Sequence, residues 1–274
     1  MNPLLRALDW TAAAFNDLPV WKGQCRVWDQ RLASPTFERW LYLRAHRLGL
    51  MGRAEKSFLE QNIRPGMCVL DVGSNLGLYS LLMARLAGET GRIICFEPDP
   101  DLFAALRRNQ ELNDLPQLEA HNLALGAAPA ELILHRSIIN SGDNHLGQKE
   151  SSLFRREVTT RVVRLDDFLP GLKLDLLKID VQGWELAVLR GMRETLQRNE
   201  AVRIYFEFSR LGYVRAGSTY EELIAFLREA GFLIFDPAAQ RELDDARIAE
   251  LVVSLDPSGY TNLLAMRRPF PNAS

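Results

Sequence analysis

The sequence predicts an α/β fold with a Rossmann-like, seven-stranded and mostly parallel sheet, preceded by a helical N-terminal extension. The first observation behind this prediction is a short apolar run at 67–72 that passes through a glycine turn into a helical pattern at 78–86. The second is the alternation of strand-like and helix-like runs after this point, which is typical of βαβ units. The length of 274 residues suffices for one large domain with an extension.

Residues 1–64 are expected to form the extension, and residues 65–274 the main domain. Ser34-Pro35 is typical of a helix start, and an apolar stripe from Phe37 to Leu48 follows at helical spacing. Four of the five tryptophans fall in this segment: Trp10, Trp21, Trp28 and Trp40. They either pack the extension onto the main domain or form a substrate lid or a dimer contact, so that a homodimer is one of the alternatives.

The main domain is expected to contain strands at 67–72, 92–96, 118–125, 174–179, 202–206, 232–235 and 262–266. Two further strand-like runs, 131–136 and 158–163, enclose a polar loop. A capping box at 218–221 begins a helix after the fifth strand. No clear helical pattern separates the last two strands, which are therefore expected to form an antiparallel closing pair.

Composition excludes several classes of protein. A net charge of −2 gives no electrostatic reason to expect nucleic acid as a partner. Three scattered cysteines indicate neither a disulfide framework nor a zinc site, so a cytoplasmic location is expected. No apolar run has the length of a membrane span.

The turn after the first strand follows the pattern D-x-G-x-x-x-G. Asp71 lies near the carboxyl end of the strand, where open α/β sheets bind ligands. Gly73 and Gly77 lack the Cβ atoms that would keep a ligand from the backbone. A dinucleotide fingerprint would need glycine at the position of Asn75. The pattern therefore favours a ligand without phosphates, although a turn that only packs helix on strand would have the same glycines.

Glu97 ends the second strand, about twenty residues after the turn. An acidic side chain at this position can accept hydrogen bonds from both hydroxyls of a ribose. Nicotinamide dinucleotides and S-adenosylmethionine (SAM) both contain a ribose, so Glu97 does not separate them. The alternative is a surface acid that caps the following helix.

Three motifs together resemble the FkbM-type methyltransferase family. They are VLDVGSNLG at 69–77, FEP at 96–98 and LKIDVQGWE at 177–185, and the likeness extends to NLALG at 122–126 and LDDFL at 165–169. The resemblance covers roughly residues 55–267 and leaves the N-terminal extension outside. It departs from the family at Gln182, where glutamate is usual; glutamine keeps the size and an acceptor oxygen but loses the charge.

The resemblance implies a class I methyltransferase fold that binds S-adenosyl-L-methionine and O-methylates a hydroxyl of a sugar, glycolipid or secondary metabolite. Asp71, Gly73, Asn75 and Gly77 would then hold the methionine part of SAM. Glu97 would bind the ribose, and Asn122 would border the adenine. The expected partner is a small-molecule or glycan acceptor.

Three residues are candidates for the chemistry of methyl transfer. Asp180 ends the fourth strand, and its carboxylate could accept the proton of an acceptor hydroxyl unless it only caps a helix. His145 lies in the polar loop and is either a general base or a solvated side chain. Glu207 ends the fifth strand and could bind the acceptor or, with Asp180, a divalent cation, but two acids are weak evidence for a metal.

Lys178 stands in an otherwise apolar strand and therefore needs a partner, with Asp180, Glu185 and Glu207 as the candidates. Two rival functions stay open on the sequence alone. One is a catalytically silent SAM-binding protein that acts through its N-terminal extension, and the other is a nicotinamide-dependent oxidoreductase.

Overall fold

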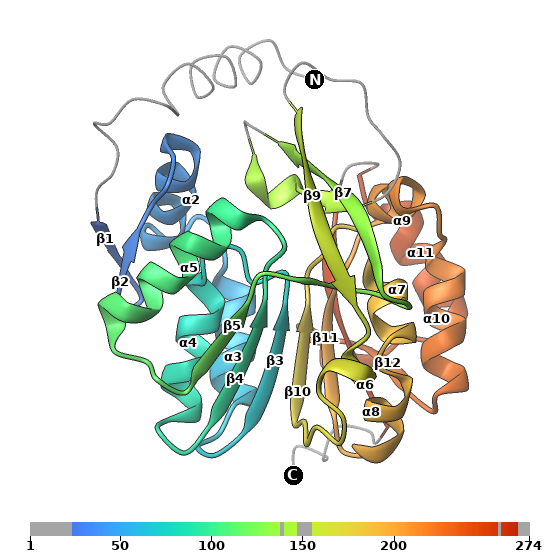
Figure 1. Ribbon diagram of the computed structural model, residues 1–274. Coiled ribbons are helices and arrows are strands. Elements are labelled where there is room, and N and C mark those ends of the chain that lie inside the picture. Colours follow the sequence, from blue (N-terminus) through green and yellow to red (C-terminus); the bar gives the residue numbers. More distant parts are fainter. Residues whose placement is uncertain (1–23, 138–139, 147–154, 257–258, 268–274) are drawn as a thin grey trace.

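A mostly parallel sheet forms the centre of the molecule (Figure 1). The computed structural model describes residues 24–137, 140–146, 155–256 and 259–267. The strands of this sheet, in spatial order, are β13 (Arg241–Glu242), β12 (Leu233–Asp236), β14 (Thr261–Met266), β11 (Arg203–Phe208), β10 (Leu176–Ile179), β3 (Cys68–Val72), β4 (Arg92–Phe96) and β5 (Leu118–His121). The seven longer strands are those that the sequence predicts, and β13 adds a two-residue edge.

Strand direction follows the predicted pattern. The strands β11, β10, β3, β4 and β5 pair in parallel, so that their carboxyl ends lie at one edge of the sheet. The last strand, β14, is antiparallel to both β11 and β12, which confirms the expected closing pair. The helix α11 (Asp245–Ser254) nevertheless lies between these two strands in the chain.

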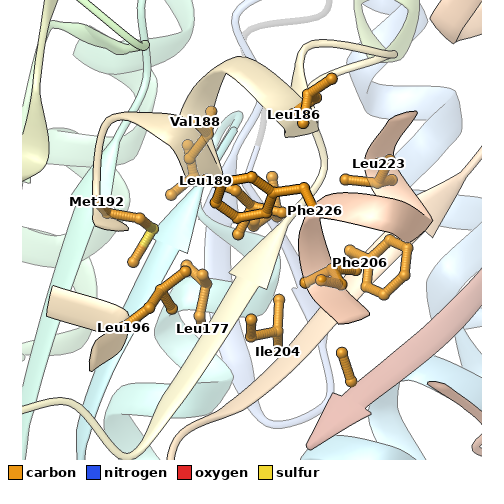
Figure 2. Packing of buried hydrophobic residues seen from close by; sticks show 14 of the residues in the cluster. Leu177, Leu186, Val188, Leu189, Met192, Leu196, Ile204, Phe206, Leu223 and Phe226 are labelled. Carbon is orange, nitrogen blue, oxygen red and sulfur yellow. The ribbon is translucent and has the colours of Figure 1, made fainter. Parts of the chain in front are cut away.

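Helices cover both faces of the central sheet (Figure 1). One face packs against α3 (Arg53–Asn62), α4 (Leu78–Ala87) and α5 (Pro100–Asn113). The other packs against α7 (Glu185–Arg190), α8 (Arg193–Arg198), α10 (Tyr220–Glu229) and α11. Alternate residues of each strand enter opposite cores, and Figure 2 shows Leu177, Ile204 and Phe206 beneath α7 and α10. No helix in the described ranges is both long and apolar enough to cross a membrane.

A second, four-stranded sheet stands beyond the carboxyl ends of the central strands (Figure 1). Its order is β6 (Ala124–Leu125), β9 (Arg155–Val163), β7 (Ala130–Ser137) and β8 (His145–Leu146). The run at 118–125 is therefore not one strand: it leaves the central sheet after His121 and joins the second sheet at Ala124. The 3₁₀ turn η2 (Ser141–Asp143) precedes β8, and α6 (Leu165–Phe168) and α9 (Arg210–Ala216) complete the described elements.

The described part of the N-terminal segment, residues 24–64, contains a hairpin as well as the expected helices. Residues 24–33 form a hairpin of β1 (Gln24–Val27) and β2 (Gln30–Ala33), and α2 (Phe37–Arg47) follows. Thr36, rather than Ser34-Pro35, caps this helix, because its hydroxyl accepts the N–H of Arg39. Trp28 packs against Tyr79 of α4, and Trp40 stacks on Phe37, whereas Trp10 and Trp21 lie outside the described residues.

Candidate functional site

A cavity of about 360 Å³ lies at the carboxyl ends of β3, β4, β10 and β11. This is the position at which open α/β sheets bind ligands, and the volume is in the range of small-molecule sites. The second sheet contributes Leu134 and His145 to its wall. The helix α2 contributes Arg39, Tyr42 and His46, so three separate parts of the chain enclose one site.

The glycine turn between β3 and α4 has a left-handed backbone at three positions, Gly73, Asn75 and Gly77. A Cβ atom on Gly73 would lie 2.0 Å from the carbonyl oxygen of Asp180, and one on Gly77 would lie 2.4 Å from Leu106. The backbone contact with Asp180 therefore requires glycine at 73, whereas at Gly77 the contact is with a side chain and the left-handed backbone favours glycine. Both glycines thus have the packing role that stood as the alternative to ligand access.

Asp71 is fully buried beneath the cavity floor. Its Oδ2 accepts a hydrogen bond from Ser80 at 2.5 Å, and its Oδ1 lies 3.7 Å from the ammonium group of Lys178. Burial raises the pKa of Asp71, and Lys178 opposes that rise. Within the described residues, Oδ1 accepts no hydrogen bond although it is buried. An orphaned acceptor of this kind is suited to a donor group of a bound ligand.

Glu97 lies at the end of β4 and lines the same cavity. Its two carboxyl oxygens accept the backbone N–H groups of Asn75 at 2.7 Å and Asp99 at 2.9 Å. Burial raises the pKa of Glu97 to about 8, against the effect of these two donors. The side chain is thus fixed in place by the turn that it faces, and it does not act as the surface acid of the alternative interpretation.

Asn122 does not reach the cavity wall. Its amide donates to the carbonyl oxygens of Glu97 at 2.9 Å and Pro98 at 3.1 Å. These bonds hold the chain where it passes from the central sheet to the second sheet. The neighbouring Leu123, Ala124 and Leu125 line the cavity in its place.

Asp180 and Glu207 lie side by side, because the parallel register of β10 and β11 pairs Ile179 with Phe206. The amide nitrogen of Gln182 donates to Asp180 at 3.3 Å and to Glu207 at 3.0 Å. The ammonium group of Lys178 lies 3.3 Å from Asp180 and 3.7 Å from Asp71. Burial alone would lower the pKa of Lys178, but Asp180 and Asp71 raise it, so the lysine is charged.

Lys178 pairs with Asp180, one of the partners that the sequence suggests, and also with Asp71, which was not among the expected partners. Glu185 is not its partner in the structure: this buried carboxyl group accepts the backbone N–H groups of Val181 and Gly183. Burial raises the pKa of Glu185 to about 7.

His145 is buried, with 1% of its surface exposed, and so is not the solvated loop histidine of the second interpretation. It belongs to β8, pairs across the sheet with His135, and lines the cavity. Its Nδ1 lies 3.3 Å from the carbonyl oxygen of Asp143. The cavity therefore brings together all three residues proposed for chemistry.

Sequence reasoning missed the contribution of α2 to the site. Arg39 is buried and pairs with Glu38, and its guanidinium also donates to Asn75 and Asn140 at 3.3 Å each. Nδ1 of His46 lies 2.9 Å from the carbonyl oxygen of Tyr42, and its Nε2 lies 3.3 Å from the Tyr79 hydroxyl. The spacing of residues 39, 42 and 46 places them on one helical face, a signal that was present in the sequence.

The described residues contain no group of three His, Cys, Asp or Glu side chains arranged to hold a metal ion. The acidic side chains that line the cavity are instead held by hydrogen-bond donors and by Lys178.

Comparison with known proteins shows which family and which characterised proteins the chain resembles. A family model described as a methyltransferase FkbM domain matches residues 71–234. "Methyltransferase 1" of Beauveria bassiana is 33% identical over 144 residues, which are 45% of this chain and 57% of that protein. "2-O-methyltransferase NoeI" of Sinorhizobium fredii is 29% identical over 162 residues, 53% of this chain and 65% of that protein.

A third relative, "Hexuronic acid methyltransferase AglP" of Haloferax volcanii, is 28% identical over 127 residues, 46% of this chain and 50% of that protein. The chain thus spans less than two thirds of the length of each of these relatives. The family model covers the glycine turn, Glu97 and the Asp180–Glu207 pair, and it matches more than half of the sequence. The chain belongs to the methyltransferase FkbM family.

Proposed function

We propose that the chain is a SAM-dependent O-methyltransferase whose acceptor is a hydroxyl group of a sugar, glycolipid or secondary metabolite. The observation that carries this proposal is the convergence of Asp71, Glu97 and Asp180 with the glycine turn in one cavity. The names of two relatives, a 2-O-methyltransferase and a hexuronic acid methyltransferase, agree with a hydroxylated acceptor.

The residues present fit SAM. The orphaned Oδ1 of Asp71 would accept a hydrogen bond from its ammonium group, and Glu97 would accept hydrogen bonds from its ribose hydroxyls. The side-chain oxygen of Asn75 accepts hydrogen bonds from the Leu76 N–H and the Arg39 guanidinium, and it would thus fix the turn that faces the methionine part. When bound, SAM supplies an electrophilic methyl group on a sulfonium.

Asp180 would accept the proton of the acceptor hydroxyl. As the acceptor oxygen forms its bond to the methyl carbon and the carbon–sulfur bond breaks, the proton of the hydroxyl would pass to this carboxylate. Lys178, 3.3 Å away, holds this carboxylate in place through an ion pair. Positioning of the acceptor contributes the rest of the rate.

The acceptor would lie between the sheet edge and the N-terminal segment. Tyr42, His46 and Glu55 from α2 and α3, with Tyr260 and Asn262 near β14, line this part of the cavity. Aromatic rings beside amide and carboxylate groups suit a ligand with many hydroxyls, because the rings cover its apolar face while the polar groups bind its edge. A small-molecule or glycan acceptor is thus favoured over nucleic acid.

Two measurements test the proposal. Calorimetric titration with SAM and with NAD should show binding of SAM alone, and binding of NAD alone would instead favour the oxidoreductase. Transfer of labelled methyl from SAM to methyl α-D-glucopyranoside, D-glucuronic acid and a wider panel of hydroxylated compounds should then occur. SAM binding without transfer to any member of the panel would favour a silent binding protein.

A further inference from the structure

Gln182 joins the two acidic side chains at the centre of the cavity. It follows β10 with a left-handed backbone, at φ of 54°, which is uncommon for a residue other than glycine. This conformation turns its side chain back toward the sheet edge, where the amide nitrogen donates to both Asp180 and Glu207. A single amide group therefore holds two carboxyl groups from neighbouring strands.

The charges around this pair do not balance if both groups are ionised. Lys178 is within ion-pair distance of Asp180 and Asp71, so one ammonium group already serves two carboxylates. Among the described residues, Glu207 has the Gln182 amide as its partner and no cation within ion-pair distance. Burial, together with the nearby Asp180 and Glu185, raises the pKa of Glu207 well above its ordinary value.

The orientation of the Gln182 amide also determines which ligands Asp180 and Glu207 can bind together. A divalent cation such as Mg²⁺ or Mn²⁺ needs oxygen ligands that face one point. Here the N–H groups of Gln182 face both carboxyl groups and would meet the cation with partial positive charge. Glutamate at this position would replace that donor by a third carboxylate beside Asp180 and Glu207.

We propose that Gln182 is a positioning residue that keeps Asp180 and Glu207 as a metal-free pair holding a single proton, at a place where one further carboxylate would create a divalent-cation site. The role of this pair in proton transfer rests on the proposed function. The charge state and the cation affinity of the pair do not rest on the proposed function, so they can be tested without SAM or an acceptor.

The first test uses Mn²⁺ as the probe, followed by electron paramagnetic resonance of the free ion. The wild-type protein should bind no Mn²⁺ at this site, and Gln182→Glu should gain one site that the added change Glu207→Gln removes. The matched control is Gln240→Glu. Gln240 also has a left-handed backbone, but it is exposed and lies in a turn that is distant from Gln182 in the sequence. A wild-type site lost in Glu207→Gln, or no gain in Gln182→Glu, would overturn the proposal.

The second test detects the shared proton in the wild-type protein. It therefore remains valid even if the Gln182→Glu variant does not fold. Infrared spectra at pH 7 should contain the band of a protonated carboxyl group that disappears in Glu207→Gln and persists in Gln240→Glu. An unchanged spectrum in Glu207→Gln would show that the pair holds no proton there and would overturn the proposal. Failure of methyl transfer would leave both readouts unchanged and would count against the proposed function alone.

Discussion

At the scale of single residues, the turn after β3 is fixed by close contacts within the chain. Gly73 has a φ of 84°, and its missing Cβ atom leaves room for the carbonyl oxygen of Asp180. The same contact aligns the end of β3 with the end of β10, where Asp71, Lys178 and Asp180 form their ion pairs. The backbone conformation at Gly73 and the placement of the charged side chains in the site therefore depend on the same contact.

We expect Gly73→Ala to destabilise the protein more than it changes SAM affinity per folded molecule. The left-handed backbone alone costs roughly 1–2 kcal/mol for alanine, and the contact with Asp180 adds to it. The control is Gly217→Ala, where the backbone is left-handed, with φ of 71° and ψ of 29°, but no atom lies within 4 Å of the added Cβ. Urea unfolding should show the larger loss for Gly73→Ala, and equal losses would contradict the role of the contact.

Glu97→Gln should weaken SAM binding about tenfold or more. The change replaces one of two acceptor oxygens by an NH₂ group, which must then face a backbone N–H of Asn75 or Asp99 or a ribose hydroxyl. A buried donor left without an acceptor typically costs about 1–3 kcal/mol. Calorimetry would measure this, with exposed Glu89→Gln as the control. An unchanged dissociation constant in Glu97→Gln would remove Glu97 from the site.

At the scale of secondary-structure elements, the central sheet and its helices follow from periodicity in the sequence. Continuous apolar runs such as 69–72 and 176–179 identify strands covered on both faces, and the residues that end them define the cavity edge. The carboxyl-end positions of Asp71, Glu97, Asp180 and Glu207 could therefore be predicted. Their partners could not be fully predicted, because the Lys178–Asp71 contact depends on the register between β10 and β3.

In the second sheet, β7 and β9 match the runs expected at 131–136 and 158–163, whereas the short strands of that sheet and the N-terminal hairpin carry much weaker local signals. The strand β8 contains only His145 and Leu146, and its burial results from pairing with β7 rather than from its own pattern. In the hairpin, polar residues such as Gln30 are buried beside α4, so the alternation typical of a strand is hidden. Both elements form through contacts with residues that are distant in the sequence, and a local sequence pattern carries no information about such contacts.

Asn109→Ala should release the hairpin from α5. Asn109 is fully buried and exchanges two hydrogen bonds with the backbone of Ala33, at 2.7 and 3.3 Å, and donates to the carbonyl oxygen of Leu76 at 2.8 Å. Buried groups left without partners cost about 1–3 kcal/mol each. Hydrogen exchange should become faster across 24–33 than across β3 or β10. Arg108→Ala, on the exposed face of the same helix, should leave the exchange rates unchanged.

At the scale of the whole molecule, the cavity joins three parts of the chain through a small set of polar contacts. Asp99 at the start of α5 pairs with Arg136 of β7 at 2.7 Å and accepts the Asn144 amide at 3.0 Å. Arg39 of α2 reaches both Asn75 and Asn140. Because the second sheet and α2 are attached to the turns that hold Asp71 and Glu97, we infer that loss of either attachment would open the site.

Stability should fall as pH rises from about 4.5 to 8, because over this range the buried acids hold protons that the unfolded chain has released. Burial raises the pKa of Glu97 to about 8 and that of Glu185 to about 7, and raises that of Glu207 as well, from an ordinary value of 4.5. In this range the folded state binds more protons than the unfolded state. Each such proton lowers the free energy of unfolding by up to about 1.4 kcal/mol per pH unit.

His46 acts in the opposite direction, and only below about pH 6.5, where its effect opposes that of the carboxyl groups. Burial lowers its pKa from 6.5, so its contribution to stability is present above pH 6.5 and is lost as the pH falls below that value. Thermal unfolding of variants from pH 5 to 8 separates the two effects. Glu97→Gln and Glu207→Gln should each flatten the decline with rising pH across this range, and His46→Gln should steepen it below pH 6.5. Glu89→Gln should retain the wild-type profile, since this side chain is exposed. A melting temperature that is constant or rises between pH 6.5 and 8 in the wild-type protein would mean that the carboxyl groups at the cavity are ionised in the folded state, and their charges would then need a counter-ion beyond Lys178.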